Sequence, residues 1–176
     1  MARSTVTEKI AERQKKAPVK IVSLAHDLGL KVYVSDTLGS NVSGMIRRDS
    51  DRGGDSGYAI FVNASHAETR RRFTIAHEVA HYILHEDLIG DGIVEDALLR
   101  ADGFSNSLER QANAMAANLL MPWHLIDRAR SEGVQTIEAL ASDFQVSKDA
   151  MSYRILGVPY SESLAIPPER VVASSQ

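Results

Sequence analysis

The five residues from His77 to His81 read His-Glu-Val-Ala-His, and they constrain this chain more than any other stretch. On an α-helix, residues four apart lie on one face about 6 Å along the axis, so both imidazoles can converge on one metal ion. A zinc ion held in this way keeps an open position for water, and the carboxylate of Glu78 can take that water's proton. The motif therefore predicts a helix with a zinc site of the metallopeptidase type.

The composition restricts which residues can bind a metal. The chain has 176 residues and no cysteine, so a disulfide scaffold is excluded and His, Asp and Glu are its only strong metal ligands. Such a ligand set suits Zn²⁺. The formal net charge of −3, with both signs interspersed, provides no general attraction to nucleic acids or acidic membranes.

The length and the hydropathy pattern predict one domain that does not cross a membrane. We expect a single metallopeptidase domain over residues 1–160 and a flexible tail over residues 161–176, which has few large apolar groups. No window approaches 18 uninterrupted apolar residues, and residues 1–16 lack the apolar segment of a signal peptide. We therefore expect a cytoplasmic protein without a membrane partner.

The first half of the chain contains helical and alternating patterns. A polar helix is expected over residues 5–16, and a second helix should run from Pro18, a suitable first position, to a C-cap at Gly29. Alternating and β-branched residues predict three strands, over residues 31–35, 42–48 and 58–63. The last two should form a hairpin around a loop rich in turn residues.

From Ser65 onward the apolar period changes from two to 3.6 residues, which predicts the helix that carries the metal motif. Ser65 and Glu68 have the spacing of a capping box at its start. Apart from its histidines this helix is apolar nearly all round, so it should lie at the centre of the domain. The predicted fold is α+β: a small antiparallel three-stranded sheet beside a mainly helical, zincin-like body.

A catalytic zinc ion needs a third protein ligand. The best candidate is Glu109, in a helical pattern over residues 107–121, because small residues share its helical face and allow close approach to the metal helix. Three acidic residues in the preceding long connection remain alternatives: Glu95, Asp96 and Asp102. That connection, residues 86–104, is long enough to form a lid or a wall of the substrate groove.

Other histidine arrangements fit less well. His85 is eight residues after His77, which is about 12 Å along a helix, too far for three imidazoles to bind one ion. A structural role for His85, or one outside the ligand set, is therefore expected. The metzincin pattern would need glycine in place of Leu84 and histidine in place of Asp87, so that class is excluded.

The chain after Pro122 contains three short helical patterns, over residues 123–131, 136–144 and 148–156. The last two lie within residues 135–157 and resemble a helix-turn-helix. The second of these helices offers only Lys148 and Arg154 as cations, and the turn lacks the usual glycine. We therefore expect packing or substrate docking from this segment, and not DNA binding.

Two longer motifs resemble those of a known family. One runs from Arg72 to His81 and continues to Leu84-His85; the other runs from Glu109 through Ala112-Asn113 to Pro122. Together they resemble the ImmA/IrrE family of bacterial metallo-endopeptidases, over roughly residues 18–157. The resemblance implies, position by position, that the zinc ligands are His77, His81 and Glu109 and that the catalytic glutamate is Glu78.

The resemblance also implies a substrate. Members of that family cleave repressors of the helix-turn-helix type and so switch on mobile-element or stress-response genes. We therefore expect a zinc endopeptidase in which Glu78 is the general base and then the proton donor to the leaving amine. The alternative is a non-catalytic zinc-containing regulatory module that binds a repressor or DNA without proteolysis. An intact Glu78 favours the enzyme.

Overall fold

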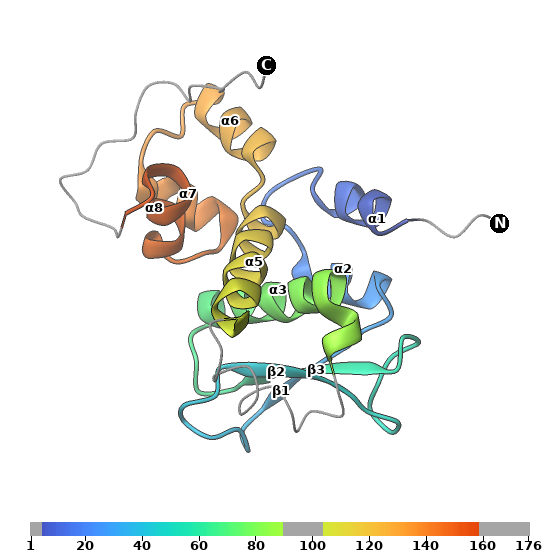
Figure 1. The fold of residues 1–176 in the computed structure, drawn as a ribbon. Coiled ribbons are helices and arrows are strands. Elements are labelled where there is room, and N and C mark those ends of the chain that lie inside the picture. Colours follow the sequence, from blue (N-terminus) through green and yellow to red (C-terminus); the bar gives the residue numbers. More distant parts are fainter. Residues whose placement is uncertain (1–4, 90–103, 159–176) are drawn as a thin grey trace.

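The computed structural model describes residues 5–89 and 104–158 (Figure 1). A small sheet lies at one end, and the described helices lie on one side of it. This arrangement confirms the predicted α+β class. The elements are α1 (Val6–Arg13), α2 (Ile21–Asp27), β1 (Lys31–Ser35), β2 (Gly44–Arg48), β3 (Tyr58–Asn63), α3 (Glu68–His85), the 3₁₀-helix η1 (Glu86–Leu88), α5 (Phe104–Leu120), α6 (Trp123–Ser131), α7 (Ile137–Phe144) and α8 (Lys148–Leu156).

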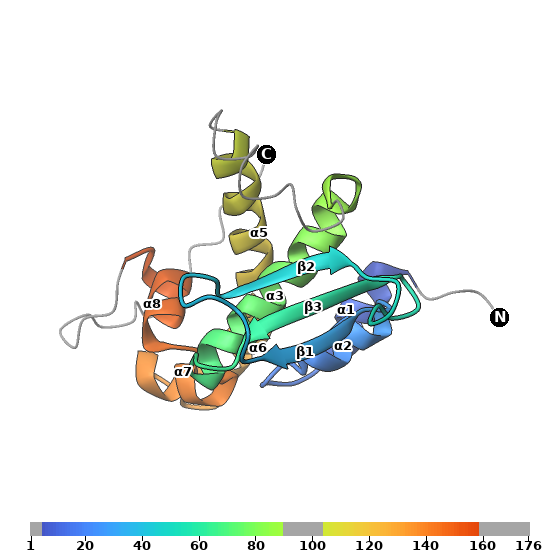
Figure 2. The same ribbon diagram turned by 90° about the horizontal axis from the view of Figure 1, so that it is seen from below.

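The three-stranded sheet has the order β1-β3-β2 (Figure 2). Strands β2 and β3 form the predicted antiparallel hairpin, with Ile46 opposite Ile60. Strand β1, however, pairs with β3 in parallel, with Tyr33 opposite Phe61, so the expected fully antiparallel sheet is wrong at this pair. The chain reverses direction twice between β1 and β3, and β3 therefore runs in the direction of β1 again. All six residues of the central β3 are buried.

The two N-terminal helices differ in how well their starts were predicted. Helix α1 begins after Thr5, which forms a capping box with Glu8. Helix α2 begins at Ile21 and not at Pro18, so that prediction was wrong. The carbonyl oxygen of Val19 accepts from the backbone N–H of Ile21 at 3.0 Å and from Nη2 of Arg72 in α3 at 2.9 Å, so its partners are not those of a helical carbonyl.

Leu28 is the C-cap of α2, and Gly29, which we predicted as the C-cap, follows it in the left-handed region at φ +84°. A side chain there would also collide with the hairpin loop, because an added Cβ would lie 2.9 Å from the backbone nitrogen of Ser56. Glycine at this position therefore serves both the turn and the contact between α2 and the loop.

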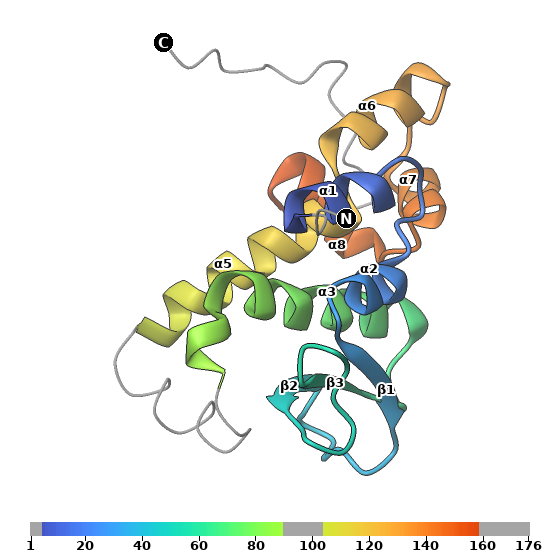
Figure 3. The ribbon, with the colours of Figure 1, turned by 90° about the vertical axis from the view of Figure 1, so that its right-hand side faces the viewer.

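Helix α3 lies across the sheet at the centre of the molecule (Figure 3). The predicted capping box is wrong, since α3 begins at Glu68 and no side chain caps it. The hydroxyl of Ser65 instead donates a 2.7 Å hydrogen bond to Oδ1 of Asn63 at the end of β3. Ala76, Val79 and Ala80 of α3 are fully buried, as the apolar pattern predicted.

Helix α5 crosses α3 on the side away from the sheet (Figures 1 and 3). It begins at Phe104, three residues before the predicted start, and it ends at Leu120, ahead of Pro122. The three acidic alternatives for the third ligand, and most of the stretch interpreted as a lid or wall, fall in residues 90–103 and lie outside the described residues. The predicted tail, residues 161–176, lies outside them as well.

The C-terminal helices follow the predicted patterns. Helices α6 and α8 have the predicted bounds, and α7 starts one residue later because Thr136 is its N-cap. The turn between α7 and α8 uses Gln145 in the left-handed conformation, with φ 53°, where a helix-turn-helix often has glycine. Among the described residues, no helix is long and apolar enough to cross a membrane.

The buried apolar residues form one core cluster that runs from Val19 near α2 to Met151 in α8. The N-terminal helices, the sheet and the C-terminal helices therefore share a core, and the single domain over residues 1–160 stays a prediction. The domain boundary at residue 160 stays a prediction, because residues 159–176 are not described.

Candidate metal centre

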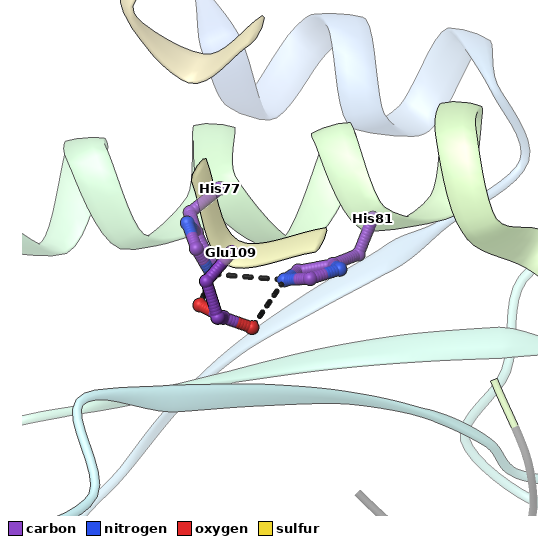
Figure 4. Close-up of side chains that lie close together, drawn as sticks. All are labelled: His77, His81 and Glu109. Atoms are coloured by element: carbon purple, nitrogen blue, oxygen red, sulfur yellow. Dashed lines mark hydrogen bonds and ion pairs between the residues drawn. The ribbon is translucent and has the colours of Figure 1, made fainter. Parts of the chain in front are cut away.

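Three potential metal ligands converge between α3 and α5 (Figure 4). The Nε2 atoms of His77 and His81, one turn apart on α3, are 3.0 Å from each other. Glu109 of α5 places Oε2 at 3.1 Å from Nε2 of His77 and Oε1 at 3.2 Å from Nε2 of His81. In residues 5–89 and 104–158, these are the three side chains of metal-ligating type whose donor atoms lie within 4.8 Å of one another.

The distances between the donor atoms fit a tetrahedral metal ion. Ligand atoms at about 2.0–2.1 Å from a tetrahedral zinc ion lie about 3.3 Å from each other. The observed separations of 3.0, 3.1 and 3.2 Å are close to that value. Two imidazoles and one carboxylate are also a ligand set of catalytic zinc sites. The residues present therefore fit the predicted ion.

Small residues on both helices allow the ligands to meet. Ala112 and Ala116, on the same face of α5 as Glu109, are fully buried, and so are Ala76 and Ala80 on α3. Side chains of one carbon let the two backbones come close, so a single glutamate side chain can bridge the gap. The prediction that small residues favour close packing of this face is confirmed by their burial.

The charge of Glu109 dominates the electrostatics of the centre. Hydrogen bonds from His77 and His81 hold the pKa of the Glu109 carboxyl far below its ordinary value. Burial opposes protonation of His77, but the hydrogen bond to Glu109 and the negative charges of Glu78 and Glu109 outweigh it, and they raise the pKa of His77. The centre therefore favours a positive charge, which a proton or a metal ion can supply.

Glu78 lies next to His77 but outside the ligand group. Its side chain is buried, with 7% of the residue exposed. It is close enough to act on the pKa of His77 through its charge. Glu78 thus lies outside the group of three possible ligands, and its catalytic role stays a prediction.

Hydrogen bonds outside the ligand group orient both histidines. Nδ1 of His77 lies 3.0 Å from Oδ1 of Asn113, and Nδ1 of His81 lies 3.2 Å from Nδ1 of His85. Nε2 of His85 in turn lies 3.4 Å from Oε1 of Gln111. If both ligand histidines use Nε2 for the metal, each carries its proton on Nδ1 and donates it outward. His85 can then accept at Nδ1 and donate from Nε2 to Gln111.

Sequence reasoning placed His85 outside the ligand set, and the structure agrees with that position. It missed the parts played by Asn113 and Gln111, which come from α5. The available signal was Asn113 four residues after Glu109, on the same helical face, with an amide oxygen that can accept a proton from a histidine. In the sequence Asn113 was noted only as part of the second family motif, without a role of its own.

Replacing His85 should weaken metal binding without removing a ligand. Outer partners of this kind typically change metal affinity by about 10- to 100-fold. We expect His85→Phe, which keeps most of the buried volume but cannot accept a proton from His81, to lower zinc affinity by about that factor. Competition with a chromophoric chelator measures it.

The matched control is His124→Ala, since His124 contacts the backbone oxygen of Gln14 and not the ligand group. This variant should bind zinc as tightly as wild type. A folded His85→Phe protein with unchanged affinity would show that the outer hydrogen bonds do not orient His81.

The fold and the centre define a class of α+β protein. In this class a helix with His-Glu-x-x-His lies beside a small sheet, and a glutamate from a second helix completes the group of possible metal ligands. The chain matches the peptidase family M78, described as the IrrE N-terminal-like domain, over residues 25–156. Because this match covers most of the chain, the protein belongs to that family. The resemblance to the ImmA/IrrE proteins is confirmed.

The chain is also similar to one protein in sequence and to another in fold. It is 36% identical over 86 residues to the radiation response metalloprotease IrrE of Deinococcus deserti, a match over 48% of this chain and 30% of that protein. A solved structure described as a Mycobacterium tuberculosis transcriptional regulator is similar in fold, with a TM-score of 0.60 at 18% identity. That similarity covers 85% of this chain and 44% of the other. The chain thus spans less than half of either protein.

Proposed function

We propose that this protein is a zinc-dependent endopeptidase that cleaves a helix-turn-helix transcriptional repressor in the cytoplasm. The observation that carries the proposal is the convergence of His77, His81 and Glu109 at 3.0–3.2 Å beside the buried Glu78. Membership of the peptidase family supports it, as does the similarity to a protein named as a metalloprotease. Cleavage would relieve repression of mobile-element or stress-response genes.

Each residue has a distinct part in the proposed reaction. His77, His81 and Glu109 hold the zinc ion, which when bound supplies Lewis acidity to water and to the scissile carbonyl. Glu78 takes a proton from the attacking water and passes it to the leaving amine. Asn113 and His85 accept the Nδ1 protons of the two ligand histidines and so keep their rings in the orientation that the ion needs.

The contacts of α8 do not favour DNA binding. One of its two cations, Arg154, lies against its own domain: Nε donates to the carbonyl oxygen of Met121 at 2.9 Å, and the guanidinium lies 4.6 Å from the centre of the Trp123 ring. A helix that reads DNA needs its cations and polar side chains directed toward the groove. We therefore propose a protein substrate and no DNA contact.

The proposal predicts zinc-dependent fragments. Incubated with the full-length helix-turn-helix repressor encoded nearest to it, the zinc-loaded protein should produce a small number of discrete fragments. Mass spectrometry of their ends should give one cleaved peptide bond. Excess 1,10-phenanthroline should stop the reaction, and added zinc should restore it. A repressor that stays whole with stoichiometric zinc present would reject this substrate, and a folded unrelated protein serves as the control.

A further inference from the structure

A cavity of about 690 Å³ lies beside the candidate metal centre, between α3, α5 and α8. Its size is within the range of about 300–1,000 Å³ that is usual for ligand pockets. Three segments far apart in the sequence line it. They include Phe73 of α3, Ala114 of α5 and Ala150 of α8, respectively.

The cavity adjoins the ligand group through Asn113. Asn113, whose Oδ1 lies 3.0 Å from Nδ1 of His77, is also a lining residue. Phe73 precedes His77 by one helical turn on α3. An extended polypeptide advances about 3.3–3.6 Å per residue. A chain with its scissile bond at the centre can therefore place a nearby side chain in this cavity.

The walls are mainly apolar and the charges are of one sign. Phe73, Met121 and Val146 provide large apolar surfaces, with alanines between them. Among the described residues that line the cavity, Arg70 and Arg154 carry a charge, and no lining residue of that set is acidic. Nη2 of Arg70 donates to the hydroxyl of Ser43 at 2.9 Å, which holds its side chain toward β2. A lysine or arginine side chain would meet like charge here.

We propose that this cavity binds a bulky apolar side chain of the substrate polypeptide, in a segment where acidic residues flank that side chain. An aromatic side chain has the size and apolar surface to fill such a space, and burial of that surface favours binding. Both guanidinium groups already bind partners in the protein, so their positive charges attract neighbouring carboxylates and repel basic residues through space and not by direct pairing. The proposal rests on the proposed peptidase function, and it specifies which peptide segments the same site accepts.

The cavity also explains what the helix-turn-helix-like segment does. Val146 and Ser147 of the turn, and Ala150, Tyr153 and Arg154 of α8, all line it. These α8 residues have the spacing of one helical face. This face of α8 therefore forms one wall of the proposed peptide site.

Filling the cavity tests the proposal. Ala114 is an exposed residue on its wall, so Ala114→Trp adds bulk to the cavity with little disturbance of the core. Ala11→Trp is the matched control, because Ala11 is exposed on α1 and does not line the cavity. The probe is the peptide acetyl-Glu-Phe-Glu-amide, compared with acetyl-Glu-Ala-Glu-amide and acetyl-Lys-Phe-Lys-amide. Binding is measured by amide NMR titration of the zinc-loaded protein.

Wild type and Ala11→Trp should bind the Glu-Phe-Glu probe at least about tenfold more tightly than either comparison peptide. A tenfold ratio of dissociation constants corresponds to a difference of about 1.4 kcal/mol in binding free energy. Ala114→Trp should lose that preference. Arg70→Glu, a change at an exposed position, leaves one negative and one positive charge on the wall and should abolish the preference for Glu-Phe-Glu over Lys-Phe-Lys, whereas Arg71→Glu at the adjacent residue should keep it. Equal binding of the three peptides by wild type, or an unchanged preference in both cavity variants, would overturn the proposal.

Cleavage is scored separately on a peptide library that varies the residues on each side of the scissile bond. A protein that cuts the library without preference for bulky apolar residues keeps its peptidase function and loses the proposed pocket. A protein that shows the binding preference and its loss in Ala114→Trp, but cuts nothing, keeps the pocket and loses the peptidase function.

Discussion

Glu78→Gln should abolish cleavage of the repressor while zinc stays bound. Glutamine has the size of glutamate but cannot take a proton from water at neutral pH, so the variant lacks the general base. Loss of such a group typically costs about 10²- to 10⁴-fold, and here the loss should reach the upper end because the same group must protonate the leaving amine. The measurement is the rate of fragment formation at saturating repressor.

Three further readouts make this test specific to the chemistry. Zinc content should remain one ion per chain, because Glu78 lies outside the ligand group. The thermal unfolding midpoint should change little, and the uncut repressor should remain in a complex with the variant. If Glu78→Gln relieved repression in cells as well as wild type does, proteolysis would not be the function. The alternative, a regulatory module that binds a repressor without cutting it, would then replace the peptidase.

Replacing the ligands should remove both the metal and part of the stability. Binding to a native site adds to folding free energy, and structural zinc sites in small peptides contribute about 10–16 kcal/mol at neutral pH. We expect the His77→Ala, His81→Ala double variant to retain no stoichiometric zinc. Glu109→Gln keeps the size of the side chain and loses its charge, so it should weaken zinc binding by orders of magnitude.

The comparison with chelated wild type separates metal loss from damage to the fold. Wild type should unfold at a lower temperature after chelation, whereas the double variant should not respond to a chelator. Metal analysis gives the stoichiometry, and differential scanning calorimetry gives the unfolding midpoints. A stoichiometric ion in the double variant would show that the metal binds elsewhere and would reject the assigned ligands.

The proposed peptide pocket assigns the C-terminal helices a docking role, which is one of the two roles that we expected from their sequence. Their resemblance to a helix-turn-helix is real at the level of helix lengths and turn, with Thr136 and Ser147 as N-caps. Hydrogen bonds nevertheless join this segment to the rest of the fold: Nε of Arg72 in α3 donates to the carbonyl oxygen of Gln145, and Nε of Arg154 donates to that of Met121, just after α5. Whether such a segment binds DNA or a peptide depends on which face is covered, and that is decided by the rest of the fold.

Local chemistry made much of this protein predictable. Strands β1 and β3 and helices α6 and α8 have the predicted bounds, because alternation, helical period and capping residues act over a few neighbouring positions. The spacing of His77 and His81 is equally local, since any α-helix places residues four apart on one face. For these features the sequence by itself was sufficient.

Tertiary contacts decided the rest. The carbonyl oxygen of Val19 pairs with Arg72 and delays the start of α2, while the side chain of Asn63 binds the hydroxyl that should have capped α3. The parallel pairing of β1 depends on two chain reversals, and the cavity depends on three segments far apart along the chain. Asn63 is only two residues from Ser65, but in the other features a local preference competes with a partner distant in sequence. A periodic pattern carries no information about that partner until the chain has folded.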